Sequence, residues 1–115
     1  MMAKLINQTQ NKVLVDNLEV ASEFVRFKGL MGKEHMDNNY ALWIKRCNSI
    51  HTFFMNFPID VIFVDKDLKV KKCIENVVPN KIVWPIWGAS SVIELKNGFL
   101  TENKTQIGDQ LHVDS

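Results

Sequence analysis

Short apolar runs, separated by turn-forming residues, recur along almost the whole chain. Runs rich in β-branched and aromatic residues predict strands, whereas the Asp, Asn, Gly and Pro residues between them favour turns. The predicted strands cover residues 12–15, 18–21, 40–44, 52–55, 59–64, 69–75, 92–96 and 111–113. Many short strands with little helix are typical of an all-β domain, so we expect a single-domain antiparallel β sandwich or a jelly-roll-like small barrel.

The segment 59–64 gives the strongest strand signal, because it is apolar throughout except at Asp60. Such a run predicts a strand that is buried on both faces. A tight turn follows it, and residues 69–75 then alternate between apolar and polar, which together predict a β-hairpin. This alternation places Val70 and Ile74 on the same face of the second strand.

One or two short helices complete the predicted elements. Ser22 is a good N-cap and predicts a helix with two phenylalanines on one face. A second helical turn is expected between Thr101, as its cap, and Gly108, as its end. Residues 77–87 contain two prolines and therefore predict a loop or an edge segment.

Length and composition restrict the number of domains and the class of partner. The chain has 115 residues, of which 46% are hydrophobic and 23% charged, as is typical of one globular domain. We expect residues 1–11 to be a flexible N-terminus, because they are largely polar, and residues 12–115 to form one β domain. The net charge of +1 gives no long-range field that would attract nucleic acid or an anionic membrane.

The chain also lacks the signals that direct a protein to a membrane. No apolar run is long enough to span a bilayer, and residues 1–11 lack the apolar core of a signal peptide. We therefore expect a cytoplasmic protein with no membrane partner. Cys47 and Cys73 fit a reducing compartment as free thiols, and nothing in their spacing requires a disulfide.

Several of these segments together resemble one family. The stretch 47–55, CNSIHTFFM, with the following 57–65, resembles the central signature of the domain of unknown function 192 family. Matching flanking pieces are Val20-Ala21, Gly29-Leu30-Met31, Pro79, Ile93-Glu94-Leu95 with Gly98, and Gly108-Asp109. The resemblance covers about residues 18–113, and Leu68 departs from it, standing where the family usually has glycine. It implies a jelly-roll-like β sandwich of a mainly prokaryotic family whose biochemical role is not established.

Cys47 and His51 are the first candidates for chemistry, being four residues apart beside a predicted strand. A neighbouring histidine can lower the pKa of a thiol, and Asp60 would then orient the imidazole in a Cys-His-Asp set. The alternative is a buried thiol and a histidine that bonds to a turn. The same residues with Met55 carry donors for copper or zinc, but no motif with metal-ligand spacing is present. We assign no catalytic set, and we expect neither a metal nor a cofactor.

Two carboxylates interrupt predicted strands. Asp60 must be hydrogen-bonded or paired, because an isolated buried charge is too costly. We expect it to accept backbone N–H groups from the turn at 56–58; the alternative is an acid with a raised pKa in a pocket. Glu94 lies between two apolar residues and is expected on a polar face, paired with a lysine such as Lys71 or Lys96.

The aromatic segment 84–88, WPIWG, falls in the predicted loop, so Trp84 and Trp87 are expected to be partly exposed. Loops of this kind line ligand pockets and interfaces, and Met55 is expected to join them as a ligand-binding residue. The leading hypothesis is a non-catalytic binding domain for a small molecule or a protein partner, acting as a monomer or homodimer, with this loop and residues 47–60 as opposite walls of the site. The alternatives are a small enzyme that uses the Cys-His-Asp set and a structural or oligomerisation module.

Overall fold

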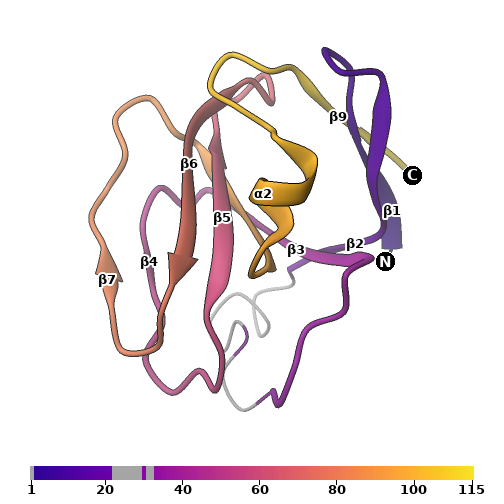
Figure 1. Cartoon of the computed structure of the whole chain (residues 1–115). Coiled ribbons are helices and arrows are strands. Elements are labelled where there is room, and N and C mark those ends of the chain that lie inside the picture. Colours follow the sequence, from indigo (N-terminus) through magenta and orange to yellow (C-terminus); the bar gives the residue numbers. More distant parts are fainter. Residues whose placement is uncertain (1, 22–29, 31–32) are drawn as a thin grey trace.

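The computed structural model describes residues 2–21, 30 and 33–115, which form a seven-stranded sheet and a separate two-stranded sheet (Figure 1). The larger sheet contains β1 (Met2–Asn7), β2 (Lys12–Val20), β3 (Tyr40–Lys45), β5 (Ile59–Val64), β6 (Val70–Val77), β8 (Ser91–Lys96) and β9 (Leu111–Asp114). The smaller sheet contains β4 (Ile50–His51) and β7 (Ile82–Val83), and the helix α2 spans Phe99–Asn103. The mainly β, single-domain architecture predicted from the sequence is confirmed.

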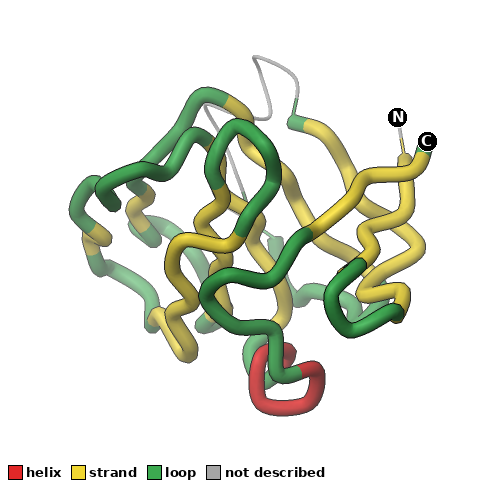
Figure 2. Tube along the Cα trace, turned by 90° about the horizontal axis from the view of Figure 1, so that it is seen from above, coloured by secondary structure: helices red, strands yellow, loops and turns green. Residues whose placement is uncertain are grey.

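The strands of the larger sheet follow the order β6-β5-β8-β3-β2-β1-β9. Neighbouring strands are antiparallel except β2 and β3, which are parallel, so the expectation of a purely antiparallel sheet is wrong at this pair. The sheet curls until the start of β9 lies beside the start of β6 (Figure 2), where the Val70 N–H donates to the Asp109 carbonyl at 2.9 Å. The two edges join there by an isolated bridge, Lys69 to Gln110, and the barrel is not closed.

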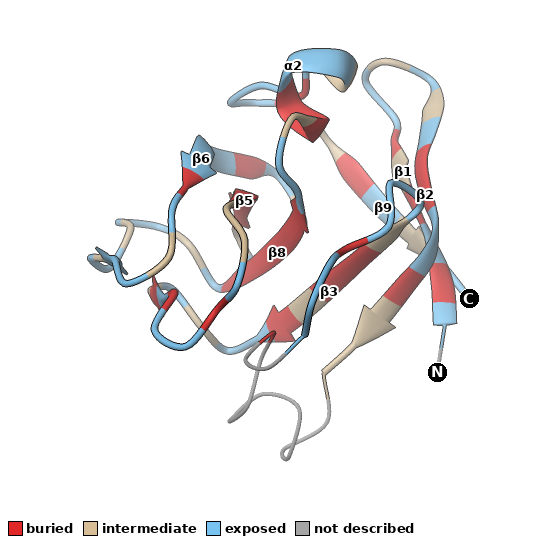
Figure 3. Ribbon diagram, turned by 60° about the horizontal axis from the view of Figure 1, so that its bottom comes forward, coloured by how far each residue is buried: buried red, intermediate tan, exposed pale blue. Residues whose placement is uncertain are grey.

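Strand β5 separates two hydrophobic cores and is buried at every position, as predicted (Figure 3). Ile62 and Val64 point into the inner core, which is covered by α2, whereas Val61 and Phe63 point into the outer core. The inner core also contains Leu5, Leu18, Ile93, Leu95 and Phe99; the outer core also contains Leu30, Met36, Leu42, Met55 and Val92. This division follows from the period-two alternation of side chains along a strand.

The N-terminal residues form a strand of the sheet, which differs from the flexible segment expected for residues 1–11. Strand β1 pairs with β2 on one side and with β9 on the other. Leu5 and Asn7 are fully buried, and the Asn7 amide donates to the Asp109 carboxylate at 2.9 Å. The polar composition of this segment therefore reflects alternation between a buried and an exposed face, not disorder.

Two other strand predictions are corrected. Residues 12–20 form one strand, because Asp16 continues the extended chain and its N–H donates to the Asn39 side chain at 2.7 Å. Residues 52–55 form a turn with Phe54 at φ 65°, and only Ile50 and His51 before it pair with β7. The prediction failed here because aromatic residues favour strands wherever they occur. The sequence pattern does not show that Phe54 adopts a left-handed backbone conformation.

The predicted hairpin of β5 and β6 is confirmed, but the faces of β6 are not as expected. A register shift between Phe63 and Val64 interrupts the alternation, so Val70 enters the inner core while Ile74 packs against the outer core. An extra residue in one strand shifts the following side chains to the opposite face.

The helix α2 starts two residues before the predicted cap at Thr101. Gly98 precedes it with φ 95°, a backbone conformation in which residues with side chains are strained. The helix ends at Asn103, with Lys104 as its C-cap, and not at Gly108. The helix predicted from Ser22 lies outside the described residues. No described helix is long and apolar enough to cross a membrane.

Candidate functional site

The two-stranded sheet brings the predicted signature and the tryptophan loop together, on the side of the molecule opposite to β1 and β9 (Figure 1). Ile50 and His51 of β4 pair with Val83 and Ile82 of β7. The Ile86 N–H also donates to the Asn48 carbonyl at 2.9 Å. Residues 47–55 and 82–88 therefore lie side by side.

Thr52 forms hydrogen bonds to residues that directly precede the second of these segments. Its backbone N–H donates to the Lys81 carbonyl at 2.9 Å, and its hydroxyl donates to the Val78 carbonyl at 2.7 Å. The Lys81 N–H returns a bond to the Thr52 hydroxyl at 2.9 Å. Because Thr52 is fully buried, these bonds are shielded from water and hold the base of the loop in place.

Large apolar side chains gather on this part of the fold without being buried by it. Trp87 is 97% exposed, Phe54 76% and Trp84 74%, and Ile82 is exposed as well. Phe53 stacks on the His51 ring at a centroid distance of 5.2 Å. We call Phe53, Phe54, Ile82, Trp84 and Trp87 the aromatic surface.

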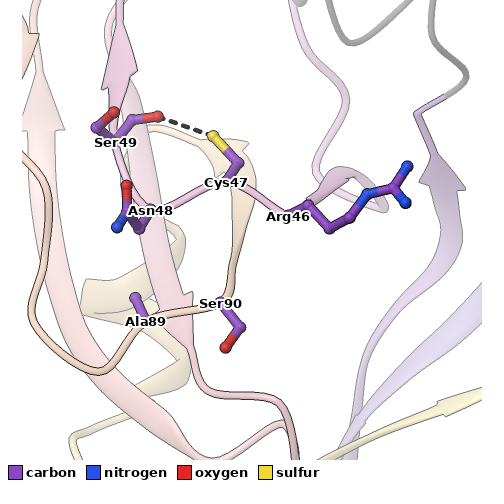
Figure 4. Close-up of a pocket in the computed structure, with 6 residues that line it drawn as sticks. All are labelled: Arg46, Cys47, Asn48, Ser49, Ala89 and Ser90. Carbon is purple, nitrogen blue, oxygen red and sulfur yellow. Dashed lines mark hydrogen bonds between the residues drawn. The ribbon is translucent and has the colours of Figure 1, made fainter.

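A hollow of about 300 Å³ lies beside the aromatic surface. Arg46, Cys47, Asn48, Ser49, Ala89 and Ser90 line it (Figure 4). The Cys47 thiol points toward Ser49 and donates to its carbonyl at 2.9 Å, whereas the Arg46 side chain points away from this pair (Figure 4). The hollow is open and its lining is mostly polar. It would therefore suit a polar group of a bound molecule that contacts the aromatic surface.

Cys47, His51 and Asp60 have different partners in the structure. Cys47 bonds to Ser49, and the His51 Nδ1 accepts from the Phe53 N–H at 3.3 Å. No hydrogen bond that the structure describes links any two of the three, and the described residues contain no cluster of metal-ligating side chains. Met55 lies in the outer core, 7% exposed, apart from the aromatic surface to which it was expected to contribute.

Asp60 stabilises the fold at the junction of three elements. Its Oδ1 accepts from the Asn76 N–H at 2.9 Å and from the Asn97 side chain at 3.2 Å. Its Oδ2 accepts from the Leu100 N–H at 2.9 Å, in the first turn of α2. The expected role as an acceptor of backbone N–H groups is thus found, but the donors belong to β6 and α2 and not to the turn at 56–58.

Glu94 differs most from expectation. It lies on the central strand β8, between Leu42 of β3 and Val61 of β5, on the face of the outer core. It is 4% exposed, and its Oε1 has no hydrogen-bond partner among the described residues. Burial raises the pKa of Glu94 to about 7. The polar face predicted for it does not exist, because β8 has a strand on either side and a core on either face.

Tyr40 adds polar groups next to Glu94 on this face. Its hydroxyl donates to the Glu19 carboxylate, and the Lys33 ammonium lies 4.6 Å from the centre of its ring. Burial, the hydrogen bond to Glu19 and the negative charges of Glu19 and Glu94 raise the pKa of Tyr40 far above its ordinary value. The sequence pattern does not reveal this group, since Tyr40 and Glu94 are brought together only by the pairing of β3 with β8.

The thiol of Cys73 is expected to react slowly. Burial, with the nearby charge of Asp109, raises the pKa of Cys73 to about 11. A rise of two pKa units leaves roughly a hundredth of the thiolate at pH 8, and the thiolate is the form that reacts. Alkylation by iodoacetamide, followed by mass spectrometry, should therefore modify Cys73 at least tenfold more slowly than a free cysteine peptide. Equal rates would contradict the burial of this thiol.

Comparison with known proteins gives a consistent result. The model of the DUF192 family, described as "Uncharacterized ACR", matches residues 5–113. A UPF0127 protein of Thermococcus sibiricus is 37% identical over 93% of this chain and 72% of its own length. A UPF0127 protein of Pyrococcus horikoshii is 32% identical over 93% of this chain and 96% of its own length.

Two solved structures share the fold. A protein of Sinorhizobium meliloti, described as a proposed transcription regulator, has a TM-score of 0.77 and 22% identity, over 96% of this chain and 91% of its own. A protein of unknown function from Novosphingobium aromaticivorans has a TM-score of 0.78 and 20% identity, over 97% of this chain and 84% of its own. At this identity the likeness concerns the fold alone. The match of the family model over residues 5–113 agrees with the resemblance seen in the sequence, and the chain belongs to the DUF192 family.

Proposed function

We propose that the protein is a non-catalytic binding domain that recognises a protein partner through the aromatic surface. The observation that carries this proposal is the exposure of two tryptophans and a phenylalanine in the segments that follow the two strands of the small sheet. Large exposed apolar groups are costly in water, and tryptophan is enriched among the residues that dominate the energy of protein interfaces.

A protein fits this surface better than a small molecule does. Small-molecule sites enclose most of the ligand in a concave pocket, whereas Trp87 and Trp84 project from the loop at 97% and 74% exposure. The adjoining hollow is open and lined mainly by polar side chains, so it does not enclose an apolar ligand. Projecting aromatic rings would instead insert into pockets of the partner.

Charge suggests what the contact surface of the partner contains. None of the 13 Asp and Glu residues lies within residues 44–59 or 76–93, which include the aromatic surface. Lys81, at the base of the loop, is exposed within the second of these segments. We infer a partner whose contact surface has apolar pockets and neutral or acidic residues around them, because opposite charges favour association and like charges oppose it.

The test is a comparison of three forms of the protein: wild type, the double variant Trp84→Ala/Trp87→Ala, and the control Ile107→Ala. Ile107 is 64% exposed and lies outside the aromatic surface. We expect one protein to be enriched from cell extract by wild type and control but not by the double variant. The purified partner should then bind the double variant at least about 30-fold more weakly than wild type, since hot-spot residues contribute about 2 kcal/mol or more.

Stability measurements on the same variants show whether a loss of binding is caused by unfolding. Because the two tryptophans are exposed, the thermal midpoint of the double variant should lie within a few degrees of wild type. A double variant that is folded and still binds the purified partner normally would contradict the proposal. So would a partner that turns out to be nucleic acid, a lipid vesicle or a second copy of this chain.

A further inference from the structure

The pair Asn97-Gly98 joins β8 to α2, and the chain contains no other asparagine that is followed by glycine. Asparagine is chemically labile in such a pair, because glycine has no side chain that would shield its backbone nitrogen. That nitrogen can attack the Cγ atom of the asparagine side chain. The pair is therefore a candidate for spontaneous modification, and its surroundings decide when the reaction can occur.

The folded protein holds the Asn97 amide in place. Its Nδ2 donates to Oδ1 of Asp60 at 3.2 Å and to Oδ1 of Asn76 at 3.2 Å. The Gly98 carbonyl, on the other side of the reacting nitrogen, accepts the Glu102 N–H at 3.1 Å. The attack draws Cγ to covalent distance from the Gly98 nitrogen, so the amide has to leave its present position. These hydrogen bonds therefore oppose the reaction in the folded state.

The product of the reaction does not suit the place that the amide occupies. Hydrolysis leaves a carboxylate at position 97, which can only accept hydrogen bonds and which faces the Oδ1 atoms of Asp60 and Asn76. The contact with Asp60 then changes from a charge-assisted hydrogen bond to a repulsion between like charges. In the isoaspartyl product the chain continues through the side chain. This adds one backbone carbon before α2 and displaces the Leu100 N–H from Asp60 Oδ2.

We propose that Asn97 is a deamidation site that the fold protects and that unfolding exposes. In the unfolded chain the Gly98 nitrogen forms a bond to Asn97 Cγ, and the bond from Cγ to Nδ2 breaks. The proton of the Gly98 nitrogen passes through water to the departing nitrogen, which leaves as ammonia, and a cyclic imide remains. Water then adds to one of the two imide carbonyl carbons and leaves an aspartyl or an isoaspartyl residue. The reaction consumes water and needs neither an oxidant nor a reductant.

Deamidation would make unfolding of this domain partly irreversible. A modified chain that refolds meets the repulsion at Asp60, so its folded state is less stable and it unfolds again more often. The modification would thus distinguish chains that have once been unfolded from chains that have not. The site lies between β8 and α2 and does not depend on the aromatic surface or its partner.

The first experiment measures the reaction on the wild-type protein at pH 8. The full chain is incubated in native buffer or in enough guanidinium chloride to unfold it. Mass spectrometry of the peptide that contains Asn97 then follows the conversion of the amide to a carboxyl group. We expect the unfolded chain to react at least about tenfold faster, because the folded protein reacts only through its small open fraction.

A pair of matched variants tests whether the hydrogen bonds give the protection. Asn76→Gly removes one acceptor of the Asn97 amide, and Asn80→Gly is its control. Both positions have a positive φ, 54° and 64°, which glycine adopts without strain. In native buffer Asn76→Gly should deamidate at position 97 about threefold faster than wild type, as expected for the loss of one hydrogen bond, and Asn80→Gly should not.

The last experiment tests the product through Asn97→Asp. We expect its equilibrium constant of unfolding at pH 8 to exceed that of wild type about tenfold or more, because a hydrogen bond to a charged group is lost. It should also exceed that of Asn97→Ala, which removes the donor without adding a charge. An Asn97→Asp protein as stable as Asn97→Ala would overturn the inference. So would equal rates of deamidation in the folded and unfolded wild-type chain, or an unfolded chain that keeps its amide.

Discussion

The Glu94→Gln protein is expected to be more stable than wild type by about 3 kcal/mol at pH 8. In the folded protein burial raises the pKa of Glu94 from 4.5 to about 7, whereas the unfolded chain keeps the ordinary value. Below pH 4.5 the carboxyl is protonated in both states and has no effect; above pH 7 it is ionised in both, and the folded state bears the cost of a buried charge. Each pKa unit corresponds to about 1.4 kcal/mol, so a rise of roughly 2.5 units gives about 3 kcal/mol.

Urea unfolding from pH 4.5 to pH 8 measures this effect. The difference in free energy of unfolding between Glu94→Gln and wild type should be small at the acid end and should grow through pH 7. Glutamine keeps the shape of the side chain without the charge, and Glu102→Gln, on the exposed side of α2, is the matched control. Stability curves of wild type and Glu94→Gln that run parallel over the whole range would show that Glu94 is not buried as described.

The Asp60→Ala protein should lose about 4 kcal/mol of stability. The substitution removes the acceptor of the Asn76 N–H, the Leu100 N–H and the Asn97 side chain, at a site that is fully buried. Hydrogen bonds to a charged group contribute about 1.5 to 3 kcal/mol each, and a buried donor left without a partner adds a desolvation cost. The expected loss approaches the whole stability of a typical domain of this size.

Comparison with Asp60→Asn separates the hydrogen bonds from the volume of the side chain. Asparagine keeps one acceptor oxygen but directs an NH₂ group at one of the donors, so an intermediate loss is expected. Asp114→Ala, at an exposed position of β9, should change stability by less than about 0.5 kcal/mol. A loss below about 1 kcal/mol for Asp60→Ala would mean that water replaces the carboxylate and that the junction does not need it.

Those parts of the fold that depend on local pattern could be predicted from the sequence. The apolar run at β5, the hairpin to β6 and the strand β8 were found because their burial is continuous or their turns are marked by polar residues. The exposed aromatic loop was also predicted, since two prolines exclude a central strand. The family resemblance then agreed with these elements over most of the chain.

The parts that depend on pairing between distant strands could not be predicted. Strand β1 was missed because its partners, β2 and β9, are needed to show which face is covered. Glu94 was placed on a polar face because alternation alone cannot tell that β8 lies between β3 and β5. Of the candidate chemical residues, Cys47 and His51 were close in sequence, yet the turn between them directs each to a different partner.

The pairing of β1 with β9 has a consequence for how the chain folds as it is made. Asn7 and Asp109 are hydrogen-bonded although 102 positions separate them, and β1 has β9 as its neighbour at the edge of the sheet. Synthesis proceeds from the N-terminus, so β1 leaves the ribosome before the other strands of the sheet. It remains without its neighbour β9 until nearly the whole domain has been translated. Until then its free edge offers unpaired backbone groups to other chains. The nascent chain should therefore be most prone to aggregation just before β9 is released, and a stop codon that removes β9 should leave a product that requires chaperones.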